Sequence, residues 1–237
     1  MVVVANQTDW NACSTLARSG TRDPIVARVL GMSTASPAPR RLTRKGQETR
    51  RRIVSAAADL IFEHGVAHTT IEDVREAADV SSSQLYHYFD DKPGLVRAVI
   101  EHQADTIVAG QETFDLSSLD GLRAWRDWVI EYQRKLNCSG GCPIGSLGSE
   151  LADTDPEARA RVAEGFKRWE TTFQSGLREM HARGRLTPDT DPDTLALALL
   201  AALQGGLLLT QIERDTKPLE AALDAMLELI ARLGGRS

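Results

Sequence analysis

The amino-acid sequence predicts an all-α fold, and three observations support this prediction. Apolar residues recur at helical spacing along most of the chain. Ala, Leu, Glu and Arg, which favour helices, are the dominant residue types. No segment alternates apolar and polar residues over a length that would indicate a strand. We therefore expect a protein built from helices and the turns between them.

The composition is that of an ordinary globular protein. The chain has 237 residues, of which 42% are hydrophobic, enough to bury a core in one large domain or two modest ones. The three cysteines, Cys13, Cys138 and Cys142, are an odd and sparse set, which favours a reducing compartment and therefore the cytoplasm. The longest apolar stretch, residues 195–209, is shorter than the roughly 20 residues of a membrane span. We expect a buried helix there and no contact with a membrane.

The charge is unevenly distributed along the chain. The net charge is -5, yet residues 40–52 contain seven Arg and Lys side chains and one acidic side chain. A basic arm on an acidic body is suited to contact with phosphates at one end of the molecule. The alternative interpretation is a solvated, charged helix start without a partner.

The first helix is preceded by a predicted flexible leader. The first 40 residues show no sustained periodicity and end in a segment rich in Ser and Pro, residues 33–39. Met32 directly precedes that segment, so we expect that translation can start there. The helical pattern begins near Thr43. Gly65 ends the first helix, because glycine readily takes the left-handed conformation that closes one.

Two capping boxes predict two short helices after the first. Thr69 and Glu72 are three residues apart and open one of them. Ser81 and Gln84 have the same spacing and open the next. A fourth helix begins near Lys92, where the following residue is a proline.

Longer helices follow, and their ends are visible in the sequence. A first apolar stripe is expected to face inward at Leu122, Trp125, Val129, Tyr132 and Leu136. Asn and Gly residues within 137–141 interrupt it. Asp155 and Asp191 each precede a proline, which predicts two further helix starts. The last helix is expected over residues 217–233.

The two short helices form a candidate DNA-binding unit. The major groove of DNA is about 12 Å wide and admits one helix of such a pair. Leu85 and Phe89 are apolar and four residues apart, so they should face the domain core. The opposite side then presents Ser82, Ser83, Gln84, Tyr86 and His87. A plain helical hairpin with its polar side in water is the alternative.

Residues 50–100 resemble the DNA-binding domain of the TetR family. The shared pattern consists of Gly65, Thr69-Thr70, Val80-Ser81 and Leu85-Tyr86-x-x-Phe89-x-x-Lys92. The resemblance implies an N-terminal, three-helix helix-turn-helix domain that binds double-stranded operator DNA.

The resemblance also implies roles for single residues. Thr70, Tyr86 and Lys92 are expected to contact phosphates. The candidate base contacts are Ser82, Ser83, Gln84 and His87. The rest of the predicted DNA-binding surface consists of Arg44, Lys45 and Ser81.

The sequence departs from the family pattern at three positions. Arg75 stands where the family commonly has Ala, Asp79 where it has Gly, and Tyr88 where it has His. Asp tolerates the left-handed conformation better than most residues, so the turn can still form at Asp79. Arg75 either faces the solvent or adds a contact to DNA.

The second half of the chain resembles the family less closely. Residues 141–151 and Trp169 are similar to the LmrA/YxaF-like branch of TetR regulators, which implies a helical ligand-binding and dimerisation domain. The expected division is a flexible leader at 1–40, the helix-turn-helix domain at 41–92, a linking helix and connector at 93–116, and the ligand-binding and dimerisation domain at 117–237.

The C-terminal helices predict a homodimer. Residues 195–212 are apolar nearly all round, and a four-helix interface between two subunits can use them together with the last helix. The apolar residues assigned to that interface on the last helix are Leu219, Leu223, Met226, Leu227 and Ile230. A two-fold dimer spaces its recognition helices about 34 Å apart, so the operator should be nearly palindromic.

The large aromatic residues gather in two helices of the second half. They can line an apolar pocket for a small hydrophobic or aromatic effector, or they can form an ordinary core. The candidate ligand-binding residues are Trp125, Trp128, Tyr132, Cys142, Phe166, Trp169 and Phe173.

The sequence therefore predicts a transcriptional repressor that a small effector releases from its operator. One alternative is a thiol-based redox sensor that uses Cys142, because a thiolate is favoured at a helix start. Another is an architectural DNA binder without sequence preference. We find no catalytic set and no metal-ligand cluster, and we expect neither enzymatic activity nor a cofactor.

Overall fold

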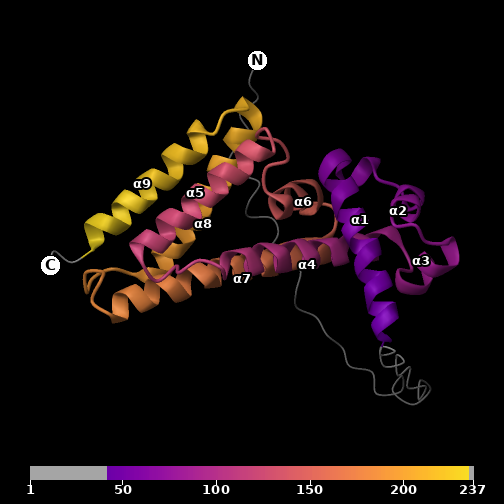
Figure 1. Cartoon of the computed structure of the whole chain (residues 1–237), viewed down its shortest axis with the longest axis horizontal. Coiled ribbons are helices and arrows are strands. Elements are labelled where there is room, and N and C mark those ends of the chain that lie inside the picture. Colours follow the sequence, from indigo (N-terminus) through magenta and orange to yellow (C-terminus); the bar gives the residue numbers. More distant parts are fainter. Residues whose placement is uncertain (1–41, 235–237) are drawn as a thin grey trace, which may run out of the picture. The chain divides into compact units, whose positions relative to one another are not determined.

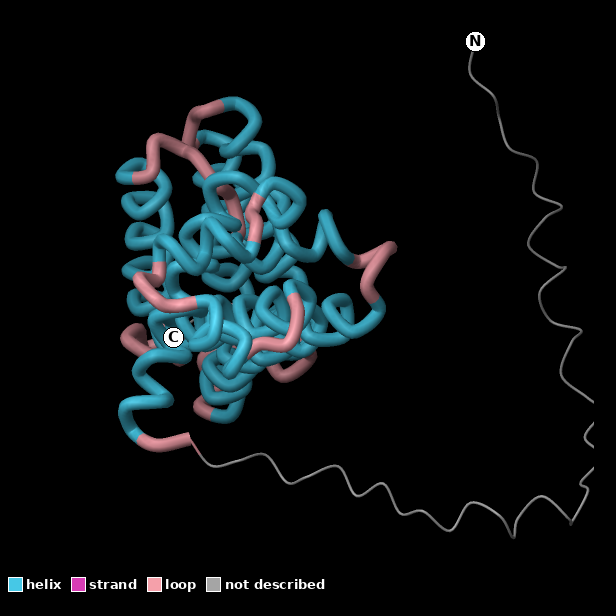
Figure 2. The backbone as a smooth tube through the Cα atoms, turned by 90° about the vertical axis from the view of Figure 1, so that its right-hand side faces the viewer, coloured by secondary structure: helices cyan, strands magenta, loops and turns pink. Residues whose placement is uncertain are grey.

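The computed structural model describes residues 42–234. Within this range there are nine helices joined by short loops and no strand. Figure 2 accordingly colours the described chain only as helix or loop. The all-α prediction is therefore confirmed. The predicted leader, residues 1–40 with Met32, lies outside the described residues.

Three helices form the N-terminal part of the described chain. They are α1 (Arg44–His68), α2 (Ile71–Ala77) and α3 (Ser82–Tyr88) (Figure 1). Thr43 caps α1 by accepting a hydrogen bond from the amide of Gly46. The apolar side chains of Ile53, Val74 and Leu85, one from each helix, are almost completely buried. Burial of these side chains holds the three helices together.

The remaining helices build the larger C-terminal part. They are α4 (Lys92–Gln111), α5 (Leu119–Lys135), α6 (Pro143–Leu151), α7 (Pro156–Ala182), α8 (Pro192–Glu213) and α9 (Lys217–Leu233). Helix α4 packs against α1 at one side and along α7 at the other, and α8 packs against both α7 and α9 (Figure 1). One continuous apolar core extends through both parts.

Three helix starts follow the same local rule. Asp91, Asp155 and Asp191 each have an extended backbone and accept a hydrogen bond from an amide in the first turn of α4, α7 or α8. Each of these helices also has a proline in its first turn, where its missing amide hydrogen has no cost. The helix starts predicted from the Asp-Pro pairs are confirmed.

The cap of α2 lies one residue beyond the predicted position. The capping box uses Thr70 and Asp73, which exchange hydrogen bonds with each other's backbone amides, rather than Thr69 and Glu72. Thr69 is buried, and its hydroxyl donates to the carbonyl of Gly65 at 2.9 Å. Both threonines carry a hydroxyl that could cap α2. The buried Thr69 uses it in the turn before the helix, and Thr70 is the N-cap.

Two predicted apolar faces are distributed differently in the fold. Tyr132 was expected to point inward on α5, but its side chain is 46% exposed. On α9, Leu219, Leu223 and Ile230 were assigned to a contact between subunits. They are instead buried within this chain, where α9 packs against α8 and α5.

A glycine allows the loop between α4 and α5 to lie directly on α7. A Cβ atom placed on Gly176 would collide with the carbonyl oxygen of Leu116. Gly110, by contrast, has room for a Cβ, because the nearest atom, from Trp128, would be 3.9 Å away. The two glycines lie in helices but differ in the space around them.

We expect Gly176→Ala to lower the melting temperature and Gly110→Ala to leave it unchanged or raise it. Alanine is favoured over glycine in a helix by about 0.5–1 kcal/mol, so both substitutions should stabilise the protein unless the new Cβ atom collides with a neighbour. Such a collision, with Leu116, is expected only at Gly176. Thermal unfolding followed by circular dichroism measures both variants. Equal melting temperatures for the two variants would contradict the close packing at Gly176.

Candidate DNA-binding surface and ligand-binding groove

The turn between α2 and α3 is made at Asp79. Its φ of 49° is left-handed, as the sequence predicted for this Asp in place of the usual Gly. Arg52 donates to the carbonyl of Asp79 at 3.3 Å, and Arg75 donates to the carbonyl of Val80 at 3.4 Å. Two arginines therefore satisfy carbonyl groups of this turn.

Arg75 has a local role in this turn. Its guanidinium also pairs with the carboxylates of Glu72 and Glu76, at 2.7 and 3.1 Å. The hydrogen bond with Arg75 lowers the pKa of Glu72. The side chain of Arg75 is 27% exposed, and an added contact of this residue to DNA stays a prediction.

The two sides of α3 differ as the sequence predicted. Leu85 and Phe89 are buried, and the guanidinium of Arg50 lies 5.2 Å from the centre of the Phe89 ring. The exposed side presents Ser82, Ser83, Gln84, Tyr86 and His87. Helix α3 is therefore amphipathic, with its polar side open to a partner.

Four of these residues border one shallow hollow. Ser83, Gln84, Tyr86 and His87 line it together with Tyr88. The rings of His87 and Tyr88 meet edge to face, with 4.9 Å between their centres. Tyr88 was noted in the sequence only as a departure from the family pattern. Tyr88 borders the hollow because it lies one helical turn after Gln84 on α3. That spacing is the sequence feature from which its position could have been predicted.

Three of the predicted DNA contacts are already engaged in capping. Ser81 accepts from the amide of Gln84, whose side-chain Oε1 accepts from the amide of Ser81 at 2.9 Å. The hydroxyl of Thr70 both accepts from the amide of Asp73 and donates to its carboxylate at 2.7 Å. The Nε2 group of Gln84 remains available as a donor to a base edge.

Three predicted cations lie near the ends of helices. Arg44 and Lys45 are exposed in the first turn of α1, and Lys92 is partly exposed at the first residue of α4. The amino ends of helices carry partial positive charge, which adds to the attraction of these side chains for phosphate.

The predicted ligand-binding residues separate into groups. Trp125 and Phe173 are fully buried and meet edge to face, with ring centres 4.9 Å apart. The rings of Phe166 and Trp169 are stacked with 6.3 Å between their centres. The first pair is core, as the alternative interpretation of these aromatic residues predicted.

A third group forms an exposed aromatic row. The rings of Trp128 and Tyr132 are stacked 5.6 Å apart, and each side chain is 46% exposed. Phe114 continues the row, with its ring centre 5.7 Å from that of Trp128. Phe114 was not among the predicted ligand-binding residues, because it lies in a loop whose position no helical period determines.

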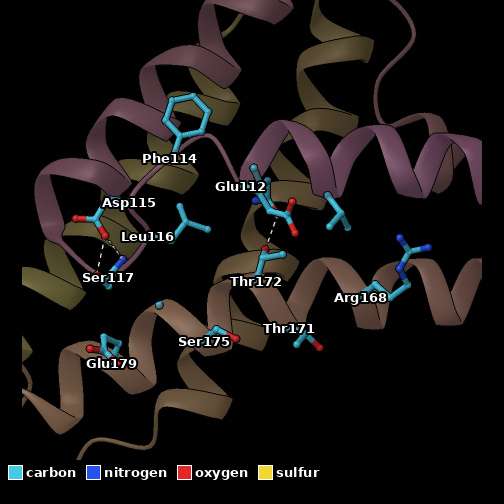
Figure 3. Close-up of a pocket in the computed structure, with 13 residues that line it drawn as sticks. Glu112, Phe114, Asp115, Leu116, Ser117, Arg168, Thr171, Thr172, Ser175 and Glu179 are labelled. Carbon is cyan, nitrogen blue, oxygen red and sulfur yellow. Dashed lines mark hydrogen bonds between the residues drawn. The ribbon is translucent and has the colours of Figure 1, made fainter.

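A groove of about 750 Å³ lies between α4, the loop that follows it and α7 (Figure 3). Its lining includes Phe114, at the end of the aromatic row, and the polar residues Glu112, Thr172 and Ser175. Thr172 donates to the Oε1 atom of Gln111 at 2.6 Å. The Nε2 atom of Gln111 is buried and has no hydrogen-bond partner among the described residues. None of the seven predicted ligand-binding residues is among those that line this groove.

Cys142 is the N-cap of α6, at the helix start that the sequence predicted. Its Sγ atom accepts from the amide of Gly145 at 3.3 Å. Burial raises the pKa of the Cys142 thiol, and the hydrogen bond to Gly145 opposes this only in part. The surroundings therefore disfavour the thiolate that a redox sensor needs.

The outer side of α8 is apolar and exposed. Leu208, Leu209 and Ile212 have exposed fractions of 57%, 47% and 67%. Among the described residues, α8 is also the helix that is long and apolar enough to cross a membrane by length and composition. Its inner side, with Leu199 and Leu203, is buried in the core, which accounts for part of this apolar content.

Comparisons with known proteins agree with this architecture. Residues 53–99 match the family model for bacterial regulatory proteins of the tetR family, and residues 118–226 match the tetracyclin repressor-like C-terminal domain. A crystal structure of a TetR transcriptional regulator from Chloroflexus aurantiacus is 31% identical, with a TM-score of 0.68 over 81% of this chain and 98% of that one.

Two relatives are similar in sequence over most of their length. The HTH-type transcriptional repressor DhaR of Mycobacterium sp. (strain GP1) is 26% identical over 76% of this chain and 91% of its own. An HTH-type transcriptional regulator from the lacX 3′ region of Lactococcus lactis is 27% identical over 79% and 96%. Both family models and the similarity to the Chloroflexus aurantiacus regulator show that this chain belongs to the TetR family of transcriptional regulators.

Proposed function

We propose that this protein is a cytoplasmic, sequence-specific transcriptional repressor that leaves its operator when a small effector binds. The observation that supports DNA binding is the exposed side of α3, where Ser83, Tyr86 and His87 surround one hollow. Arg44 and Lys45 at the start of α1 are exposed, and Lys92 at the start of α4 is partly exposed. Hydrogen-bonding groups suit contact with base edges, and cations suit contact with the phosphate backbone. Repression is proposed from the relative DhaR, which is named a repressor.

A selection from random double-stranded DNA with the full chain tests this proposal directly. The selected duplex is then titrated in a mobility-shift assay with unrelated DNA as competitor. We expect an enriched, nearly palindromic sequence whose complex survives the competitor. An architectural binder would instead enrich no sequence and would lose its complex to any competitor as salt is raised.

Two substitutions separate base contacts from phosphate contacts. We expect His87→Ala to reduce the preference for the selected duplex over unrelated DNA by about tenfold, because a base contact is lost. Lys92→Ala should weaken binding to both DNAs alike and reduce the slope of log affinity against log salt by about 1. Lys135→Ala, which removes an exposed cation at the end of α5, is the control for net charge. Equal effects of His87→Ala on both DNAs would contradict its assigned role.

We also propose a homodimer through exposed apolar side chains of α8 and α9. Leu208, Leu209 and Ile212 on α8 and Leu229 on α9 are all exposed. A large apolar patch of this kind marks an interface in a soluble protein, and dimers are typical of the family. This face differs from the one assigned from the sequence on α9, of which Leu219, Leu223, Leu227 and Ile230 are buried within the chain.

We expect Leu209→Glu combined with Ile212→Glu to convert the dimer to monomers, because two carboxylates would be buried without partners. Tyr132→Glu is a matched control, since it changes an exposed apolar side chain of similar exposure on α5. Sedimentation velocity measures the oligomeric state. A double variant that remains dimeric would place the interface elsewhere.

The effector is proposed to bind at the groove between α4 and α7 and along the aromatic row of Phe114, Trp128 and Tyr132. The row offers partly exposed aromatic rings to a hydrophobic or aromatic molecule, and Phe114 belongs to both features. Gln111 offers a buried donor at the groove. The similarity of residues 141–151 to the LmrA/YxaF-like branch remains a proposal about the chain's place within the family.

We expect Trp128→Ala to raise the effector concentration needed for half-maximal release of the operator by about tenfold. The affinity for DNA without effector should not change. An effector is first found by screening small molecules for release of the selected duplex. Arg123→Ala, on an exposed position of the same helix, is the control. An unchanged response in Trp128→Ala would exclude the aromatic row as part of the site.

A further inference from the structure

Helix α1 is broken three residues before its end. Gly65 has φ 79° and ψ 166°, which is not a helical conformation. A break of this kind separates the amide groups of the following turn from the carbonyl groups of the preceding one. The amides of Val66 and Ala67 therefore need acceptors from elsewhere, as at the start of a new helix.

A carboxylate from α6 supplies both acceptors. Glu150 Oε2 accepts from the amide of Val66 at 3.0 Å, and Glu150 Oε1 accepts from the amide of Ala67 at 2.8 Å. An N-cap side chain accepts hydrogen bonds from backbone amides in the first turn of a helix, and Glu150 does the same here. Unlike an ordinary N-cap, it lies 84 residues away from Val66. Both bonds join an ionised acceptor to neutral donors, which makes them stronger than bonds between neutral groups.

The capped turn leads directly into the helix-turn-helix. Thr69 closes it by donating to the carbonyl of Gly65, and Thr70 is the N-cap of α2. Few torsions separate the amides bound by Glu150 from the first residue of α2. A displacement of the Glu150 carboxylate is therefore expected to move the start of α2 by a similar amount.

A second contact joins α1 to the same region. The ring of Phe62 lies against Gly140 so closely that a Cβ atom at Gly140 would collide with it. Gly140 belongs to the loop that precedes α6, where Asn137 and Cys138 also have left-handed backbones. Phe62, Gly140 and Glu150 border one cavity of about 160 Å³ between α1, α4 and α6. Helix α6 and the loop before it thus hold the end of α1 from two directions.

We propose that Glu150 is a positioning residue that fixes the helix-turn-helix relative to the C-terminal part by capping the last turn of α1. The geometry gives α6 a connection to the DNA-binding helices that does not pass through α4. A movement of α6 changes the direction in which α2 and α3 are presented. This inference rests on the proposed DNA binding, but the capping itself can be tested without DNA.

The test compares Glu150→Gln with Asp153→Asn. Each variant removes one negative charge at the end of α6, and Asp153 is exposed. An amide side chain keeps the shape of Glu150 but lacks its charge and has only one acceptor atom, so one backbone amide loses its bond. Hydrogen exchange of a peptide spanning residues 66–74 should be faster in Glu150→Gln than in Asp153→Asn, while the melting temperatures stay close. Equal exchange in both variants would overturn the proposal, whatever DNA is bound.

The second readout is the ratio of affinities for the selected duplex and for unrelated DNA. We expect Glu150→Gln to reduce this ratio by about fivefold, because the two recognition helices of a dimer are held less firmly in register. Asp153→Asn should raise both affinities slightly and leave the ratio unchanged. If the wild-type protein shows no preferred sequence, the proposed function fails while hydrogen exchange still decides the role of Glu150. A preference that is equal in both variants would show that the cap does not position the helix-turn-helix.

Discussion

The packing of α4 against both α1 and α7 is the contact on which the rest of the described fold depends. Leu95, Val99 and Ile100 are buried in the first half of α4, where it meets α1. Farther along, Gly165 of α7 allows Ala104 to approach, since a Cβ there would lie 3.1 Å from the Cβ of Ala104. One helix therefore packs against both α1 and α7, and the position of the N-terminal helices is tied to that of α7 through its length.

Glu150 adds a second connection that differs in kind from the first. Apolar packing along α4 depends on area and shape, and it is lost gradually as surfaces separate. Hydrogen bonds from the amides of Val66 and Ala67 depend on direction and distance, and they break over a fraction of the same displacement. The junction between the N-terminal and C-terminal helices therefore combines stable apolar packing with one contact that is sensitive to small displacements.

The exposed side of α3 shows how a short helix divides its polar residues between those that cap it and those that stay available to a partner. A seven-residue helix cannot support itself by propensity alone, so its end needs capping. Ser81 and part of Gln84 serve that purpose. Ser83, Tyr86 and His87 are exposed and take no part in the cap. The predicted set of DNA contacts includes residues of both kinds, because residue type and spacing do not distinguish a capping hydroxyl from an uncommitted one.

The aromatic residues show that a sequence pattern alone does not predict which side chains are buried and which are exposed. Trp125 and Trp128 lie three residues apart on α5, yet the first is fully buried and the second is 46% exposed. Their sequence environments are alike, and only the position of α7 decides which of them meets Phe173. Phe114 joins the aromatic row from a loop, and a loop has no period from which its neighbours can be deduced.

The sequence by itself determined the features that depend on neighbouring residues. These are the helical fold class, the Asp caps of α7 and α8, the left-handed turn at Asp79 and the amphipathic character of α3. Only the tertiary structure decided the features that join distant segments. These are the groove beside Gln111, the burial of Leu219 and Leu223 within the chain, and the cap from Glu150. A cap or a turn is formed by atoms a few bonds apart, so neighbouring residues determine it. An interhelical contact depends on how whole helices cross, and the crossing geometry is set by all of the packing around them.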